Sequence, residues 1–130
     1  MKYLLFFISL NVYAIDAVYI DQIGNHNNVL VSQTGENKTG MIQINSDNNS
    51  INLEQKDSGE QYAIISASGG NKNIDVSQQG AGSHVANITL SGNSSSLNLL
   101  QTGNTQQSYS INFNCATVGG CQPIQIQQGN

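Results

Sequence analysis

A short pattern of alternating apolar and polar residues recurs about ten times along the chain and constrains its fold most. Each copy carries an apolar pair at positions i and i+2, and most pairs begin about 11 or 12 residues after the one before. The pairs are Val18/Ile20, Val29/Val31, Ile42/Ile44, Ile51/Leu53, Tyr62/Ile64, Ile74/Val76, Ala86/Ile88, Leu97/Leu99, Tyr109/Ile111 and Ile124/Ile126. Alternation with a period of two is typical of a β-strand with one buried face. Its regular recurrence indicates a repeat architecture.

Two copies of the pattern make about 22 or 23 residues, which suits one coil with two facing strands. We therefore predict an all-β fold, a two-sided β-solenoid of about five strand-arc-strand-arc coils with amyloid-like stacking. At ~4.8 Å per stacked strand, five coils would rise roughly 24 Å. The expected core residues are Ile20, Val29, Val31, Ile51, Leu53, Ile64, Ile74, Val76, Ile88, Leu97, Leu99 and Ile111.

A glutamine follows many of the apolar pairs two residues later, on the same face of the expected strand. A buried side-chain amide needs partners, and the amide of the next coil offers both a donor and an acceptor. Steps of one coil each place Gln33, Gln55, Gln78 and Gln101 in one predicted column, with Gln22 on the opposite side. Glycines supply positive φ to the arcs, and Asn27 and Asn49 cap them. The predicted stacking and arc residues are Gln22, Gly24, Asn27, Gln33, Gly35, Asn49, Gln55, Gln78, Gly80, Gln101, Gly103 and Gln128.

The composition supports stacking and disfavours several other classes of protein. The chain has 18 Asn and 14 Gln against 12 charged residues, and hydrophobic residues make up 38%, below the usual ~45–50%. Low charge argues against ordinary disorder, whereas Asn/Gln-rich, β-prone chains stack into ladders. Because the chain is acidic and has no Arg, we do not expect it to bind nucleic acid.

Residues 1–14 resemble a secretory signal peptide, with one lysine, a short apolar run and Ala14 at a cleavage position; cleavage after Ala17 is the alternative. We expect a repeat solenoid over 18–114, a cysteine loop over 115–121 and a C-terminal strand over 122–130. In an exported protein Cys115 and Cys121 form a possible disulfide, and two free thiols are the other interpretation.

The stretch from Gln22 to Gln33 resembles the curlin repeat, Ser-x5-Gln-x-Gly-x-x-Asn-x-Ala-x3-Gln, of the subunits of curli. Gln22, Gly24, Asn27 and Gln33 match it position by position, while Val29 replaces the small alanine. Later copies are weaker, and the cysteine loop is not part of the pattern. The resemblance implies a secreted β-solenoid subunit of a functional amyloid fibre, with secretion and nucleation proteins in the outer membrane as partners.

The leading functional hypothesis is a structural subunit of a curli-type fibre at the cell surface, growing by templated strand stacking. The alternative is a monomeric β-solenoid that presents a flat polar face to a glycan or another surface. We expect no enzymatic activity, no metal and no cofactor. His26 and His84 are expected as solvated arc residues, and Asp21, Glu54 and Asp75 as outward-facing carboxylates on separate strands.

Overall fold

Every regular element of the protein is a β-strand in the computed structural model, which describes residues 16–129. The strands are β1 (Ala17–Gln22), β2 (Asn28–Gln33), β3 (Lys38–Ile44), β4 (Ser50–Lys56), β5 (Gln61–Ser66), β6 (Lys72–Gln79), β7 (His84–Gly92), β8 (Ser95–Thr102), β9 (Gln107–Cys115) and β10 (Ile124–Gln128). Within that range of the chain there is no membrane-spanning helix.

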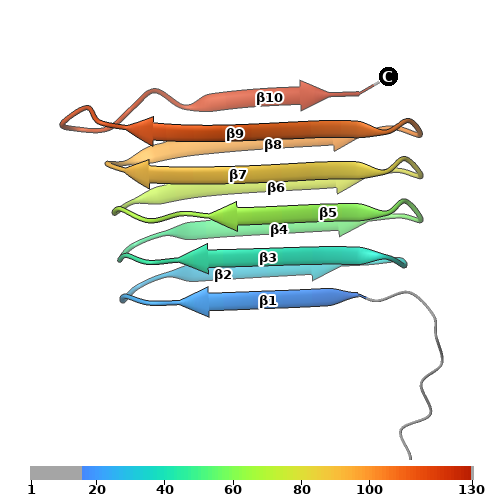
Figure 1. Ribbon diagram of the computed structural model, residues 1–130, viewed down its shortest axis with the longest axis horizontal. Coiled ribbons are helices and arrows are strands. Elements are labelled where there is room, and N and C mark those ends of the chain that lie inside the picture. The colour runs from blue at the N-terminus through green and yellow to red at the C-terminus, as the bar shows by residue number, and fades with distance from the viewer. Residues whose placement is uncertain (1–15, 130) are drawn as a thin grey trace, which may run out of the picture.

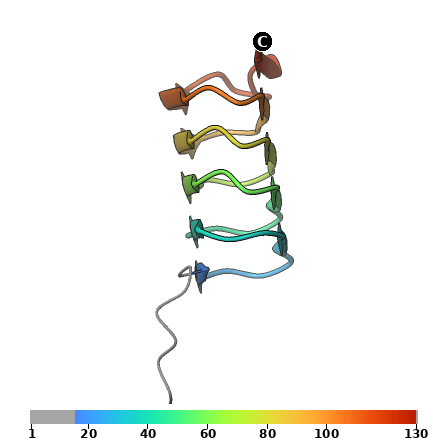
Figure 2. The same ribbon diagram turned by 90° about the vertical axis from the view of Figure 1, so that its right-hand side faces the viewer.

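The ten strands form two parallel sheets that face each other across a narrow interior (Figures 1 and 2). The odd sheet has the order β1-β3-β5-β7-β9, and the even sheet has the order β2-β4-β6-β8-β10. Each coil contributes one strand to each sheet, and short arcs join the strands at both ends of the coil. This arrangement confirms the predicted two-sided β-solenoid of about five coils.

The strands pair in register, so that residues one coil apart lie directly above one another. In the odd sheet one such column is Ile20, Ile42, Ile65, Ile88 and Ile111. In the even sheet a matching column is Val29, Ile51, Ile74, Leu97 and Ile124. Alternate residues of a strand point to opposite faces, so each column lies wholly inside or wholly outside the solenoid.

Backbone hydrogen bonds follow the same alternation. Inward-facing residues direct their N–H groups toward the previous coil, as in Gln61 N to Asn37 O at 3.0 Å and His84 N to Glu60 O at 2.9 Å. Outward-facing residues direct them toward the following coil, as in Asn28 N to Asn49 O at 2.8 Å. The two ends of the solenoid therefore offer complementary rather than identical sets of backbone groups.

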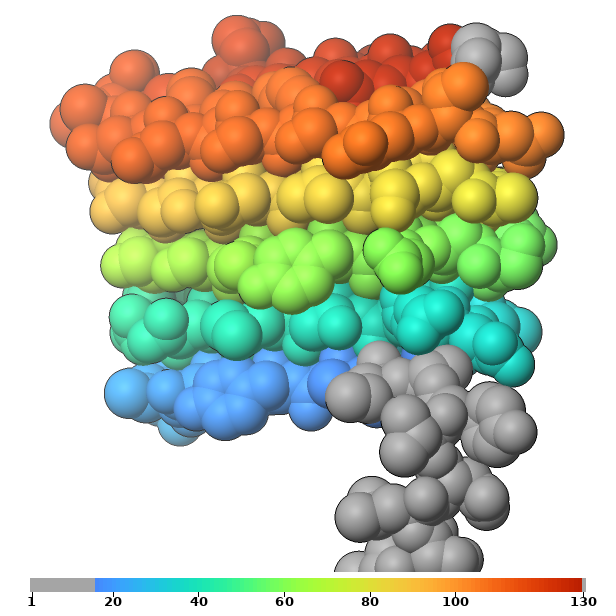
Figure 3. All heavy atoms as spheres, turned by 45° about the vertical axis from the view of Figure 1, so that its right-hand side comes forward, coloured from blue at the N-terminus to red at the C-terminus, as the bar shows by residue number. Residues whose placement is uncertain are grey.

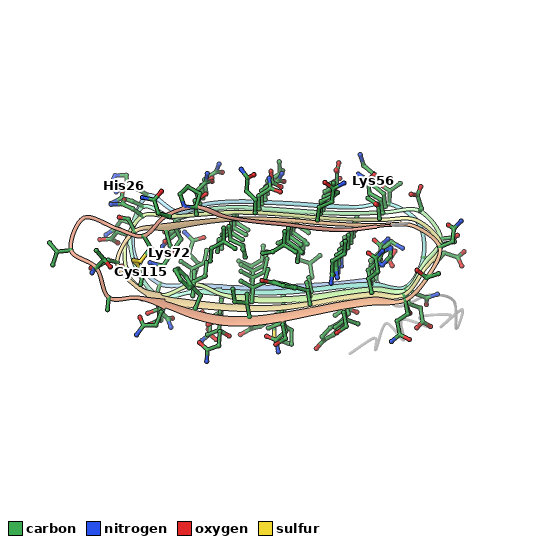
Figure 4. The ribbon with its side chains drawn as sticks, turned by 90° about the horizontal axis from the view of Figure 1, so that it is seen from above. His26, Lys56, Lys72 and Cys115 are labelled. Carbon is green, nitrogen blue, oxygen red and sulfur yellow. A yellow bond between two sulfur atoms is a disulfide. The ribbon has the colours of Figure 1, made fainter. Side chains whose placement is uncertain are left out.

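The core is a continuous aliphatic cluster between the two sheets (Figure 4). Its buried members are Ile42, Ile44, Ile51, Leu53, Ala63, Ile65, Ala67, Ile74, Val76, Ala86, Ile88, Leu90, Leu97 and Leu99. Of the predicted core residues in the outer coils, Val29, Val31 and Ile111 pack against this cluster while partly buried. Ile20 has the inward register but is 43% exposed, because β1 is an edge strand.

The prediction that Tyr62 and Ile64 face inward, with Ile64 in the core, is wrong, because both lie on the outer face of β5. Ile65 is fully buried and stacks between Ile42 and Ile88, whereas Ile64 lies in the outward column with Met41. The segment Tyr62-Ala-Ile-Ile-Ser66 offers an apolar pair in either register, since both Tyr62/Ile64 and Ala63/Ile65 are apolar. The in-register pairing with the neighbouring coils and the small Ala63 decide in favour of burying Ile65, because the Ala63 column also holds Gly40 and Ala86.

The predicted signal peptide, residues 1–14, lies outside the described residues. The chain just after it already contributes to the first coil: Asp16 Oδ1 accepts a hydrogen bond from Lys38 N at 2.9 Å. The carbonyl oxygen of Ala17 accepts another from the Gln33 side chain at 3.4 Å. These contacts join Asp16 and Ala17 to the first two coils.

The assignment of Ile65 to the core leads to a direct test by substitution. We expect Ile65→Ala to lower the free energy of unfolding by about 2–4 kcal/mol, because it leaves a cavity in a packed interior. Ile64→Ala, one residue away on the outer face, should lower it by less than about 1 kcal/mol. Guanidinium denaturation of the unassembled protein measures both values, and a larger loss for Ile64→Ala would contradict the register.

Candidate functional site: the stacking ladder and its arcs

A ladder of glutamine side chains runs along the whole even sheet, at the last inward position of each strand. It consists of Gln33, Gln55, Gln78, Gln101 and Gln128. Each Nε2 donates to the Oε1 of the glutamine in the next coil, at 2.8, 2.8, 2.8 and 2.7 Å in chain order. Every bond in this ladder therefore points in the same direction, from the N-terminal coil toward the C-terminal coil.

Each ladder amide also donates to the opposite sheet. The acceptors are the carbonyl oxygens of Ala17, Thr39, Tyr62, Val85 and Ser108, at 3.1–3.4 Å. Both amide hydrogens are thus used in the first four rungs, and the ladder ties the two sheets together as well as the coils. Gln55, Gln78 and Gln101 are fully buried, so these bonds replace all of their contact with water.

Small residues on the facing odd strands make room for the ladder. A Cβ atom on Gly40 would lie 2.9 Å from Leu53 Cδ2 and 3.5 Å from the Gln33 Nε2. Ala63 and Ala86 occupy the same inward column in the next two coils. The close approach of the two sheets at this point depends on this column of small side chains.

The predicted ladder residues differ in their placement. Gln128 extends the predicted column by one coil, although the final step is 27 residues instead of 22 or 23. Gln22 lies in the odd sheet beside Ile44 and is exposed, so among the described residues it has no glutamine next to it in its column. The odd sheet carries Ile44, Leu90 and Phe113 at this position, and these side chains pack in or against the aliphatic core instead of forming a hydrogen-bonded ladder.

Asn27 and Asn49 form a second, shorter ladder at the opposite end of the coils. Asn27 Oδ1 accepts hydrogen bonds from both N and Nδ2 of Asn49, each at 3.0 Å. Asn49 Oδ1 in turn accepts one from Lys72 N at 2.9 Å, and its Nδ2 donates to the carbonyl of Ser46 at 3.0 Å. The predicted local bonds are present, from Asn27 Nδ2 to the carbonyl of Ile23 at 3.4 Å and from Asn49 Nδ2 to that of Ser46, and the bonds to the next coil were not predicted.

The four predicted arc glycines all have positive φ, namely Gly24, Gly35, Gly80 and Gly103. At Gly80 the backbone is packed so closely that a Cβ would lie 2.2 Å from the carbonyl oxygen of Gly103. The same column holds Asp57 at φ 73°, and its carboxylate accepts a hydrogen bond from Gly80 N at 3.0 Å. An Asp tolerates this left-handed conformation better than most residues.

Two fully buried lysines were not predicted. Lys38 lies inside one arc, where its Nζ donates to the carbonyl oxygens of Glu36, Asp57 and Gly59 at 2.7–2.8 Å. Lys72 lies at the other end of the coils and donates to the carbonyls of Gly92, at 2.6 Å, and Asn93 (Figure 4). Each ammonium group thereby fastens the arc of its own coil to the arc of the next.

Burial lowers the pKa of Lys72. Burial also lowers the pKa of Lys38, although the nearby carboxylates of Asp16, Asp57 and Glu36 oppose that shift. The carbonyl groups around each Nζ replace the water that an exposed ammonium group would bind. The two side chains therefore serve as internal clamps for the arcs.

His84 is buried instead of solvated, contrary to the prediction for an arc histidine. It begins β7 in the column of Lys38, Gln61 and Gln107. Its Nε2 lies 2.8 Å from the carbonyl oxygen of Gln79, five residues earlier. Gln61 and Gln107 donate from Nε2 to carbonyls at the same five-residue distance, so this column closes one set of arcs much as Asn27 and Asn49 close the other.

Cys115 and Cys121 form a disulfide with their Cα atoms 5.8 Å apart. The bond spans the final arc, 116–123, which is longer than the preceding arc on that side, 93–94. β10 pairs with β8 alone, since it is the edge of the even sheet. The disulfide closes a short loop directly before this weakly held strand, an effect worth about 2 kcal/mol in loop entropy.

The polar side chains of the described strands divide into hydrogen-bonded amides inside the solenoid and carboxylates on its outer faces. No group of three or more His, Cys, Asp and Glu side chains in residues 16–129 is arranged to hold a metal ion. The carboxylates of Glu54 and Asp75 face outward, where Glu54 pairs with Lys56 at 2.6 Å and Asp75 accepts a hydrogen bond from Asn52 at 3.2 Å. The amides, arcs and unpaired strand edges instead present groups that another coil could pair.

Comparison with family models, with curated proteins and with solved structures gives no match for this chain.

The buried lysines lead to a prediction about pH. Because Lys72 has a lowered pKa in the folded state, the unfolded chain binds more protons between that pKa and about 10.4, the usual lysine value. Stability should therefore rise with pH across this window. Chemical denaturation at a series of pH values should show a smaller rise for Lys72→Met than for the wild type. Lys56→Met, which removes a lysine 43% exposed, is the matched control, and an unchanged slope in Lys72→Met would refute the assignment.

The disulfide leads to a prediction about β10. Reduction should lower the hydrogen-exchange protection of the inward amides of Ile124, Ile126 and Gln128 by roughly 10–30-fold, given a loop contribution of about 2 kcal/mol. Protection of Ile51 and Leu53, in the interior strand β4, should stay unchanged. Exchange measured by mass spectrometry on the oxidised and reduced protein separates these regions, and equal protection of β10 in both forms would count against the proposed role.

Proposed function

We propose that the protein is a structural subunit of an extracellular, amyloid-like fibre of the curli type, built by end-to-end stacking of solenoids. The direction of the glutamine ladder is the observation that carries this proposal. Among residues 16–129, Gln33 Oε1 has no ladder amide below it, because β2 is an edge strand, and Gln128 has no ladder carbonyl above it. One end of the solenoid thus offers an acceptor and the other offers a donor, in the same column.

The backbone supports the same end-to-end contact between two subunits, which we call the joint. If the alternation of the inner coils continues, the N–H groups of inward-facing residues in β1 and β2 point toward the N-terminal end of the solenoid. The N–H groups of outward-facing residues in β9 and β10 then point toward its C-terminal end. Stacking coil one of a second subunit on coil five of the first would place β1 on β9 and β2 on β10. Both new pairs would be parallel, as are all the pairs within the subunit.

The side chains at the two ends match in kind. Continuing the columns would place Ile20 of one subunit on Ile111 of another, and Val29 and Val31 on Ile124 and Ile126. Val18 and Ile20 are 48% and 43% exposed in the single subunit, and the other apolar side chains that would meet in the joint are partly buried. Their burial in the joint would stabilise it by the hydrophobic effect, at roughly 25 cal/mol per Å² of apolar surface.

A joint between unlike ends repeats without limit. Such a heterologous contact produces an open filament unless its rotation closes a ring. Solenoids that remain single protect their ends with polar caps, and among residues 16–129 no element crosses either end of the stack (Figure 1). The contact between unlike ends therefore supports fibre growth over a single binding module.

Export and surface assembly complete the proposal. The leader-like segment 1–14 and the disulfide both suit an oxidising compartment. By resemblance to the curlin repeat, secretion and nucleation proteins of the outer membrane would deliver the subunit and start the fibre.

The proposal predicts that the protein without its leader, residues 15–130, forms fibres that bind thioflavin. Aligned fibres should give a meridional X-ray reflection at about 4.7–4.8 Å, since the strands lie perpendicular to the stacking axis. A protein that stays monomeric for days at high concentration would contradict the proposal.

Variants at the joint test the mechanism of growth. Gln33→Ala with Gln128→Ala should slow elongation from wild-type seeds by about fivefold or more, because each joint loses a buried hydrogen bond worth about 1 kcal/mol or more. Gln43→Ala with Gln125→Ala removes two exposed glutamines from the outer faces of β3 and β10 and is the matched control. Equal rates for the two double variants would show that the ladder does not form across the joint.

A further inference from the structure

The outer face of the odd sheet carries an apolar patch that fibre stacking does not use. It consists of Tyr19, Met41, Tyr62, Ile64 and Val85, which we call the odd-face patch. Tyr19, Met41 and Ile64 form one outward column, and Tyr62 and Val85 belong to the neighbouring column. Tyr19 is 57% exposed, and Met41 and Tyr62 are each 39% exposed.

We propose that this patch pairs two stacked solenoids side by side, odd face against odd face. The proposal rests on the fibre proposed above, because stacking would repeat the patch along one side at intervals of five coils, or roughly 24 Å. The partner is a second copy of the same stack. Sheets that pack face to face in this way lie about 10 Å apart, with their side chains interdigitated.

Charge favours a second copy as the partner. Among the outward-facing side chains of the described odd strands, Asp21 alone is charged, and it lies at the margin of the patch. The even face carries Glu54, Lys56 and Asp75 on its outward positions and has fewer apolar residues, Leu30 and Leu100. Two odd faces can therefore approach each other without burying a charge at the centre of the contact.

The shape of the face also suits a partner with a flat surface. The stacked coils form a flat side of the molecule (Figure 3). A recess of about 310 Å³ opens beside the patch and is lined by Thr39, Tyr62 and Val85 of the outer face and by arc residues that include the carboxylate of Glu60, at the margin of the contact. This recess offers room for an aromatic side chain from the opposing face.

The size of the patch makes pairing depend on stacking. Four coils and two columns cover roughly 250–300 Å², estimated from the strand spacing and the pleat. A standard stable interface needs about 800 Å² per partner, so one subunit should not pair through this face. A stack of three or four subunits reaches that area, and repeated contacts along two fibres reinforce one another.

Mass per length measured by dark-field electron microscopy of unstained fibres tests the inference. In wild-type fibres we expect two subunits in each five-coil repeat along the axis, and one in Met41→Ser with Tyr62→Ser. Unassembled wild-type protein should show no pairing in sedimentation velocity. Leu30→Ser with Leu100→Ser makes the same kind of change on the even face and should keep two. Thermal unfolding of the unassembled variants verifies that each one folds.

Several results would overturn the pairing. They are wild-type fibres with one subunit per repeat, a patch variant that keeps two, a control variant that also falls to one, or pairing of single subunits. Absence of fibres would contradict the stacking itself, an outcome that is plainly distinct from single-width fibres. Binding of labelled cellohexaose that is lost in the patch variant, with mass per length unchanged, would assign the face to polysaccharide instead.

Discussion

In-register parallel stacking is the constraint on which the rest of this structure depends. Every inward side chain lies on the equivalent side chain of the next coil, so a buried polar group can be satisfied by its own kind. An amide meets this condition because it carries a donor and an acceptor on one rigid plane. The even sheet uses that property at each ladder glutamine, and the chain thereby tolerates a row of buried amides that would be costly in an ordinary core.

In the arcs, several types of side chain bond backbone carbonyl groups that no strand can pair. A turn between two sheets leaves carbonyl groups pointing into a small space where no strand can pair them. Gln61 and His84 reach carbonyls five residues earlier, and Asn49 bonds the backbone on both sides. Lys38 and Lys72 reach further and draw carbonyls of two coils around one ammonium group. The interior of the arcs is therefore polar, although Gln61 Oε1 and His84 Nδ1 are buried there without a hydrogen-bond partner, while the interior of the strands is aliphatic.

The sequence predicted the parts of this fold that repeat with a fixed spacing. The coil number, the even-sheet core and the glutamine column all follow from the near-constant interval between equivalent residues. Ile64 was misplaced because its neighbours alternate in either register, and small inward residues such as Ala63 give little signal in a search for large apolar pairs. Lys72 and His84 were missed because charged and imidazole side chains usually indicate solvent. A clue was available, since each stands at the start of a strand, at the positions that Asn49 and Gln61 occupy in the preceding coil.

The common direction of the ladder bonds has an electrical consequence. Aligned amide groups polarise one another, and their dipoles add along a chain of hydrogen bonds, as peptide dipoles add in a helix. The five ladder amides thus form a small macrodipole parallel to the stacking axis, with its N–H pole at the coil of Gln128. Two subunits approaching with like poles together would repel at short range, while unlike poles would attract. In the proposed fibre, the groups that satisfy one another inside the subunit would therefore also favour one orientation of an incoming subunit.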